Sequence, residues 1–202
     1  MKRKLKVIGQ IFIIVSLVII SFLSVYNYYQ TQKDEEMVND YIEETKIVDE
    51  EEMEEEEPEI KKEYQQEINY TAILEMPSIN LKRGVVDSTK NFSSINYAIS
   101  VDEHSNYPDK EGNFILYAHS GNSNISYFKK LINVNIGDSV YVYYKGVKYN
   151  YEITNKYDIE KTGKADVLLS NSDKYITLIT CNPNRKGYQV ILIGKLLEQS
   201  NY

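Results

Sequence analysis

The sequence predicts an all-β domain, a barrel or a sandwich, preceded by a single membrane-spanning helix. Two observations predict this organisation: residues 7–25 (VIGQIFIIVSLVIISFLSV) contain no charged residue, and from Tyr70 onwards short apolar runs alternate with turn residues. Strand-sized runs separated by turn residues are typical of all-β folds. The length of 202 residues fits one such domain with additional segments.

The apolar run has the properties of a membrane anchor. At about 1.5 Å per residue it is long enough to cross a hydrocarbon core about 30 Å thick. A basic segment (KRKLK) lies just before it, so we expect residues 1–6 to be a cytoplasmic tail and the remainder to lie outside the cell. A cleaved signal peptide is the alternative, but its apolar region is normally shorter and is followed by small residues at a cleavage site.

Residues 26–69 are expected to form an acidic extracellular stalk. The segment contains EEEMEEEEPE at 50–59, and such a density of like charge does not bury an apolar core. We therefore expect an extended chain or a loose helix, which Pro58 would end at the latest. We interpret the stalk as a spacer, and a binding segment for a basic partner is the alternative.

The remaining segment, 70–202, is the predicted globular domain. Runs of β-branched and aromatic residues predict strands, and Lys145 and Gly146 predict a hairpin turn between two of them. Residues 125–132 (ISYFKKLI) have apolar residues at helical spacing and predict a short helix. The predicted strands are 72–76 (AILEM), 113–118 (NFILYA), 139–144 (SVYVYY), 147–154 (VKYNYEIT), 175–180 (YITLIT) and 190–197 (VILIGKLL).

Composition excludes several classes of function. The net charge is −7 and the globular segment has no basic cluster, so we expect no nucleic-acid partner. The single cysteine excludes an internal disulfide and a cysteine-rich zinc site. Acidic residues in 157–167 are too scattered for a calcium site, so we expect no metal and no cofactor.

Two side chains with catalytic potential stand where predicted strands end. Cys181 follows the run YITLIT, and His119 follows FILYA. Reactive groups placed where a rigid strand gives way to a loop are typical of sites built on a scaffold. A single cysteine or histidine in such a place is more often structural than catalytic. His104 lies in a polar stretch that predicts a solvated loop.

The segments around both residues resemble sequence motifs of the sortases. Thr177 to Cys181 (TLITC) resembles the Thr-Leu-x-Thr-Cys signature, and residues 117–122 (YAHSGN) resemble the histidine motif. Residues 73–79 (ILEMPSI), 127–131 (YFKKL) and 136–138 (IGD) are similar to other family segments in the same order. The resemblance covers roughly residues 70–198.

The resemblance implies a closed eight-stranded β-barrel with one or two short helices, and a cysteine transpeptidase of Gram-positive cell surfaces. It implies that Cys181 attacks the Thr carbonyl of an LPXTG-like sorting signal and forms a thioacyl enzyme, while His119 acts as general acid and base. The acceptor would be an amine of the cell wall or a pilin lysine. The implied partners are therefore sorting-signal proteins, the amine acceptor and the lipid bilayer at 7–25.

The third member of the family's catalytic set, an arginine, departs from the pattern. Gln189 stands where the family's last strand usually begins with Arg, and Arg185 lies in the preceding loop. We expect Arg185, whose long side chain could reach back to the site from this loop, to be the arginine that the resemblance implies, and Gln189 is the alternative donor to the oxyanion. Arg83 is expected at the surface. Thr180, Gln189 and Ser120 are the expected substrate-binding residues, and 157–167 is expected to form a wall that recognises the sorting signal.

Two other functions stay open. An L,D-transpeptidase is also an exported cysteine enzyme, but its Ser-His-Gly-Cys motif is absent because Cys181 follows Ile179 and Thr180. A catalytically inactive, membrane-anchored barrel that only binds is the second alternative, and Gln189 at the arginine position favours it.

Overall fold

The computed structural model describes the whole chain apart from residues 1, 47–69, 88–97, 124 and 163–172. It divides into two units, residues 1–37 and 38–202. Helix α1 (Lys2–Glu44) contains the predicted anchor and continues beyond it. By length and composition the helix is able to cross a membrane. The glutamate-rich part of the predicted stalk lies outside the described residues.

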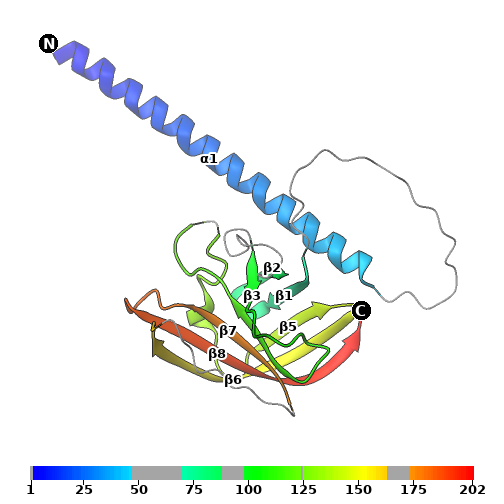
Figure 1. The fold of residues 1–202 in the computed structure, drawn as a ribbon. Coiled ribbons are helices and arrows are strands. Elements are labelled where there is room, and N and C mark those ends of the chain that lie inside the picture. The colour runs from blue at the N-terminus through cyan, green and yellow to red at the C-terminus, as the bar shows by residue number, and fades with distance from the viewer. Residues whose placement is uncertain (1, 47–69, 88–97, 124, 163–172) are drawn as a thin grey trace, which may run out of the picture. The chain divides into compact units, whose positions relative to one another are not determined.

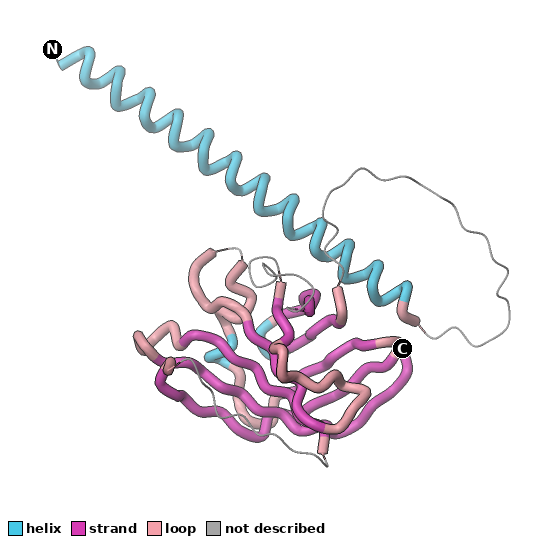
Figure 2. Tube along the Cα trace, viewed as in Figure 1, coloured by secondary structure: helices cyan, strands magenta, loops and turns pink. Residues whose placement is uncertain are grey.

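Eight strands close into a barrel, as expected from the resemblance (Figure 1). Their order around the barrel is β1-β2-β3-β4-β7-β8-β6-β5. Figure 2 shows that strands make up most of this unit and that helical segments are short. The strands are β1 (Ala72–Met76), β2 (Leu81–Asp87), β3 (Ile99–Val101), β4 (Gly112–Tyr117), β5 (Ser139–Tyr144), β6 (Val147–Glu160), β7 (Lys174–Cys181) and β8 (Tyr188–Asn201).

Six of the eight strands were predicted, and the differences lie at their ends. β1 and β5 have the predicted bounds, and β4 and β7 differ by single residues. β6 and β8 are longer because they pair with each other over almost their whole length, with register shifts that mark bulges. β2 and β3, which pair in parallel, were not predicted.

The predicted helix at 125–132 is a series of turns that ends in the 3-10 helix η3 (Leu131–Asn133). Its backbone hydrogen bonds span three residues, from Leu131 N to Phe128 O (3.0 Å) and from Val134 N to Leu131 O (3.1 Å). The apolar spacing predicted the buried side correctly, because Phe128 and Leu131 are fully buried. A second 3-10 helix, η1 (Pro77–Ile79), joins β1 to β2.

The hairpin between β5 and β6 turns at the predicted residues. Lys145 and Gly146 both have positive φ angles, 49° and 75°, as a two-residue turn of the type I′ class requires. In β5, buried and partly exposed residues alternate along the strand, so one face of it points into the barrel. The apolar interior is centred on large buried side chains such as Phe114, Tyr151 and Leu178.

Candidate active site

The parallel pairing of β4 with β7 positions the two candidate catalytic residues. Tyr117, the last residue of β4, is paired with Ile179 of β7. His119 and Cys181 each come two residues after this pair. Neighbouring strands lie about 4.8 Å apart, so the register brings the two positions to adjacent places on the same edge of the barrel.

Hydrogen bonds continue this pairing beyond the end of β4. The Thr180 hydroxyl donates to the carbonyl of Ala118 at 2.8 Å, and the Ser120 hydroxyl donates to the carbonyl of Cys181 at 2.6 Å. Both hydroxyl-bearing side chains are buried. Ser120 and Thr180, expected as substrate-binding residues, therefore fix the backbone on either side of the His119 and Cys181 positions.

The backbone of His119 is also held from the following segment. Phe128 N donates to the His119 carbonyl at 2.9 Å, and the Phe128 ring is fully buried. The His119 side chain remains partly exposed, and Cys181 is exposed with a free thiol. A rigid backbone thus carries two accessible side chains, as a site for a large substrate requires.

Gln189 lies directly across from Cys181 in the antiparallel β7–β8 pair. Directly opposed residues of an antiparallel pair project from the same face of the sheet. Leu178 and Leu192 point into the apolar interior from these strands, so the alternation of side chains places Cys181 and Gln189 on the outer face. The residue at the family's arginine position is therefore a neighbour of the thiol.

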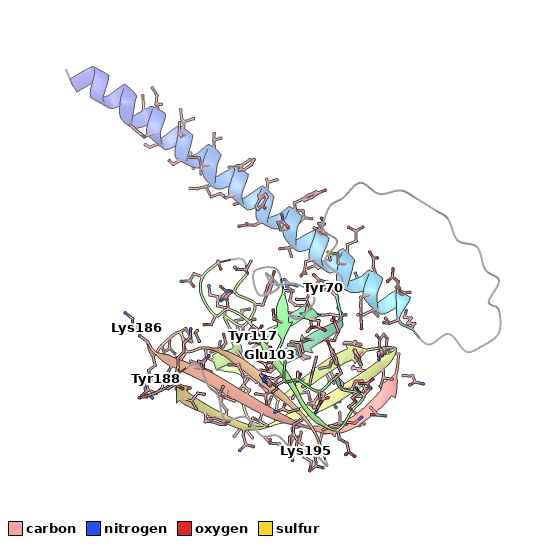
Figure 3. All side chains as sticks on the ribbon, in the orientation of Figure 1. Tyr70, Glu103, Tyr117, Lys186, Tyr188 and Lys195 are labelled. Atoms are coloured by element: carbon pink, nitrogen blue, oxygen red, sulfur yellow. The ribbon has the colours of Figure 1, made fainter. Side chains whose placement is uncertain are left out.

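The side chain of Arg185 makes a different contact. Its guanidinium carbon lies 3.3 Å from the centre of the Tyr188 ring, a stacked cation–π arrangement. Tyr188 precedes Gln189 on β8 and thus projects from the other face of the strand. The Tyr188 hydroxyl donates to Glu160 at 2.9 Å, which raises the pKa of Tyr188. Figure 3 shows Tyr188 and Lys186 near one end of β8 and Lys195 away from them.

A lysine that the sequence did not single out lies beside the thiol. Lys161 Nζ is 3.6 Å from Cys181 Sγ. The backbone N–H of Lys161 donates to the carbonyl of Gly187 at 2.8 Å, so the β6–β8 pairing extends one residue past Glu160. Nothing in the sequence indicates this contact. Only the register of β6 with β8 distinguishes Lys161 from the other lysines of the domain.

Asn182 organises the turn that follows the thiol, and it too was missed. Its side-chain carbonyl accepts hydrogen bonds from the backbone N–H groups of Asn184 (2.8 Å) and Arg185 (3.1 Å). Its amide donates to Asp158 at 2.8 Å. The Asn-Pro-Asn sequence after Cys181 was a usable signal, since an Asn side chain commonly caps such a turn.

The other residues considered from the sequence lie away from this edge or are only partly described. His104 is exposed, with Nδ1 at 3.2 Å from Asp102 Oδ1, as expected of a solvated loop. The expected recognition wall, 157–167, begins as part of β6, and residues 163–167 lie outside the described residues. Within the described ranges, no three His, Cys, Asp or Glu side chains gather as metal ligands would.

The fold and the site together define a class of protein: a closed β-barrel with a cysteine and a histidine at the ends of two parallel strands. The sortase domain model matches residues 74–197. This match covers more than half of the chain and includes both residues. The chain belongs to the sortase family.

Solved sortase structures share the fold. Sortase A of Listeria monocytogenes matches with a TM-score of 0.58 and 22% identity over 66% of this chain and 90% of that chain. A sortase D5 transpeptidase of Clostridium perfringens matches with a TM-score of 0.56 and 20% identity over 66% of this chain and 84% of that chain. Sortase C of Streptococcus pneumoniae matches with a TM-score of 0.59 and 20% identity over 66% of this chain and 72% of that chain. A search of curated proteins found no match.

Proposed function

We propose that the chain is a sortase-type cysteine transpeptidase that cleaves an LPXTG-like sorting signal and transfers the protein to an amine. The observation that carries the proposal is the β4–β7 register, in which the positions of His119 and Cys181 are adjacent at the ends of parallel strands. Sortase C of Streptococcus pneumoniae is described by its pilin substrate specificity, so a pilin lysine is one candidate acceptor. An amine of the cell wall is the other.

The reaction would follow nucleophilic catalysis in two steps. The Cys181 thiolate attacks the Thr carbonyl carbon of the signal, the peptide C–N bond breaks, and His119 in its protonated form gives its proton to the departing amine. The acceptor amine then loses a proton to His119 and attacks the thioester carbonyl, which releases Cys181. The partial exposure of His119 and the exposure of Cys181 support access by two successive polypeptide substrates.

Stabilisation of the oxyanion and binding of the signal remain part of the proposal. Arg185 is the charged candidate, and it would have to leave the Tyr188 ring to reach a substrate on Cys181. Gln189 is opposite the thiol and offers a neutral amide donor. Ser120 and Thr180 are proposed to contribute by fixing the strand ends, and 157–167 is proposed to contact the signal.

We also propose that the enzyme works at the outer surface of a Gram-positive cell. Residues 1–6 would remain in the cytoplasm, 7–25 would cross the membrane, 26–69 would form the stalk and 70–202 the catalytic domain. The exposed apolar residues of α1, such as Phe12, Val18 and Phe22, support a lipid environment for this segment.

Peptide cleavage by the full chain in detergent tests the proposal. We expect wild-type protein to cleave an LPXTG-like peptide and to form a thioester at Cys181, detectable by intact-protein mass spectrometry. Cys181→Ala should abolish both signals and leave the melting temperature nearly unchanged, since the side chain is exposed. Undiminished cleavage by Cys181→Ala would exclude this cysteine as the nucleophile.

Arg185→Ala and Gln189→Ala separate the two oxyanion candidates. Loss of one preorganised donor typically lowers kcat by about 10²–10³. We expect the larger loss in Arg185→Ala, because a charged donor stabilises an oxyanion more than an amide does. A larger loss in Gln189→Ala, measured as kcat/KM with the same peptide, would assign this role to the residue at the usual arginine position.

The second candidate function is an inactive, anchored barrel that only binds its partner. Gln189 in place of the family's arginine is the feature that favours it. In that case the wild type would bind a sorting-signal peptide without cleaving it, and Cys181→Ala would bind equally well. Measuring binding and cleavage on the same peptide distinguishes the two functions.

A further inference from the structure

We propose that Lys161 is a catalytic residue that holds Cys181 in its nucleophilic, thiolate form. The inference rests on the proposed function, because it gives the proposed nucleophile an ammonium partner directly after the end of β6. Its basis is the 3.6 Å distance between Lys161 Nζ and Cys181 Sγ. A lysine beside a cysteine is a general way to favour the thiolate over the thiol.

The backbone holds this lysine in place. Its N–H donates to the carbonyl of Gly187 at 2.8 Å, and the next residue, Thr162, donates to the Glu160 carbonyl at 2.9 Å. Gly187 has a φ of +82°, a conformation that residues with a Cβ rarely adopt. The β7–β8 loop thus returns to β8 with a carbonyl directed at the Lys161 N–H, and the backbone of Lys161 is fixed relative to the strand end that carries the thiol.

The carboxylates closest to Lys161 in the sequence are engaged elsewhere. Glu160 accepts the hydrogen bond from the Tyr188 hydroxyl, and Asp158 accepts one from the Asn182 amide. Both are an odd number of residues from Lys161 along an extended chain, so their side chains project from the opposite face. The ammonium group is therefore directed at the sulfur rather than at a carboxylate of its own strand.

The contact also supplies a permanent positive charge beside the thiol, which neither Gln189 nor Arg185 supplies there. Gln189, opposite the thiol, is neutral, and the Arg185 guanidinium lies on the Tyr188 ring. Lys161 follows the end of β6 and Gln189 belongs to β8, and both neighbour Cys181. In this arrangement one residue, Lys161, places positive charge beside the thiolate, and a different residue donates the hydrogen bond to the oxyanion.

Alkylation of the thiol with a neutral and an anionic reagent tests the role of the charge. With iodoacetamide or iodoacetate, the thiolate sulfur forms a bond to the CH₂ carbon and iodide leaves, so no other reactant is needed. In the full chain in detergent, we expect Lys161→Met to slow the reaction of Cys181 with iodoacetamide about fivefold, the size expected of one charge pair about 4 Å apart in water. The reaction with iodoacetate should slow by a larger factor, because the variant no longer attracts the carboxylate of this reagent.

Three further variants make the test specific. Lys161→Arg should keep the wild-type ratio of iodoacetate to iodoacetamide rates, and Lys161→Gln should behave as Lys161→Met. Lys174→Met removes the same charge from the first residue of β7, the end opposite Cys181, and should leave both rates unchanged. The inference would be overturned if Lys161→Met kept the wild-type ratio of iodoacetate to iodoacetamide rates, or if Lys174→Met changed this ratio as much as Lys161→Met does.

Peptide cleavage, measured on the same samples, separates this inference from the proposed function. If Lys161→Met changes alkylation as expected but wild type cleaves no sorting-signal peptide, the lysine contact stands and the transpeptidase proposal fails. If wild type cleaves the peptide and Lys161→Met alkylates and cleaves as wild type does, the lysine has no such role.

Discussion

The edge of the barrel at the ends of β4 and β7 differs from the barrel interior in how its side chains are held. At the edge, Cys181, Lys161 and Arg185 are exposed, and backbone hydrogen bonds fix the chain beneath them. In the interior, Phe114 and Tyr151 are held by packing on all sides, with exposed fractions of 1% and 0%. The proposed chemistry and the stability of the domain therefore depend on different residues.

This difference gives a rule for substitutions. A side chain at the edge contributes little buried area, so its removal should change the reaction and leave the free energy of unfolding within about 0.5 kcal/mol. A side chain in the interior contributes buried area and close contacts, so its removal should lower stability and leave the reactivity of the folded protein unchanged.

After Cys181→Ala, which should abolish the reaction, His119→Ala should have the largest effect at the edge. Removal of a general acid–base residue typically costs about 10²–10⁴-fold, so we expect kcat/KM for peptide cleavage to fall by that factor. The melting temperature should be unchanged, because the backbone hydrogen bond from Phe128 N to the His119 carbonyl remains. A fall in melting temperature that accounts for the lost activity would show that the residue supports the fold instead.

Phe114→Ala should have the largest effect in the interior. The ring is almost fully buried and lies 5.7 Å, centre to centre, from the ring of Tyr107. We expect the free energy of unfolding to fall by about 3–5 kcal/mol, as measured by denaturant titration. Below the unfolding transition, Cys181 should react with iodoacetamide at the wild-type rate, and a slower reaction would show that the interior and the edge are coupled.

The predictable parts of the molecule are those whose pattern is local. The alternation in 139–144 and the turn at Lys145 and Gly146 predicted the β5–β6 hairpin, since hairpins depend on neighbouring residues. β2 and β3 could not be predicted in this way. β3 has three residues and pairs in parallel with β2, and β2 contains Gly84, where a Cβ would clash with the ring of Tyr70.

The sequence predicted that the candidate site lies at two strand ends, but not how its residues are arranged in space. The motifs at 117–122 and 177–181 indicated His119 and Cys181, but their adjacency depends on the parallel register of β4 with β7. Lys161 was not predictable, because its contact with Cys181 requires β6 to pair with β8 past residue 154. Pairings between distant strands carry little local signal, and the sequence therefore left the cation beside the thiol unidentified.

Tyr151→Phe tests the interior with the smallest expected effect. The Tyr151 hydroxyl is buried and, among the described residues, has no hydrogen-bond partner. Burial, with a smaller effect of Tyr149, raises the pKa of Tyr151 above its ordinary value of 10.0. Because an unpaired buried hydroxyl costs free energy, the phenylalanine variant should be as stable as wild type at neutral pH, or more stable by about 1 kcal/mol.

The same substitution should change the alkaline stability of the barrel. A raised pKa in the folded state means that the unfolded state releases the phenolic proton first, near pH 10. Below pH 10 the hydroxyl is protonated in both states, and the free energy of unfolding does not change with pH through this group. As the pH rises from 10 towards the folded-state pKa, the free energy of unfolding falls by up to about 1.4 kcal/mol per pH unit for each such group. Denaturant titrations at pH 9 to 11.5 should show a shallower loss in Tyr151→Phe than in wild type. Part of the loss should remain, because burial also raises the pKa of Tyr107 and Tyr143, and equal slopes in both proteins would show that the Tyr151 hydroxyl is solvated in the folded state.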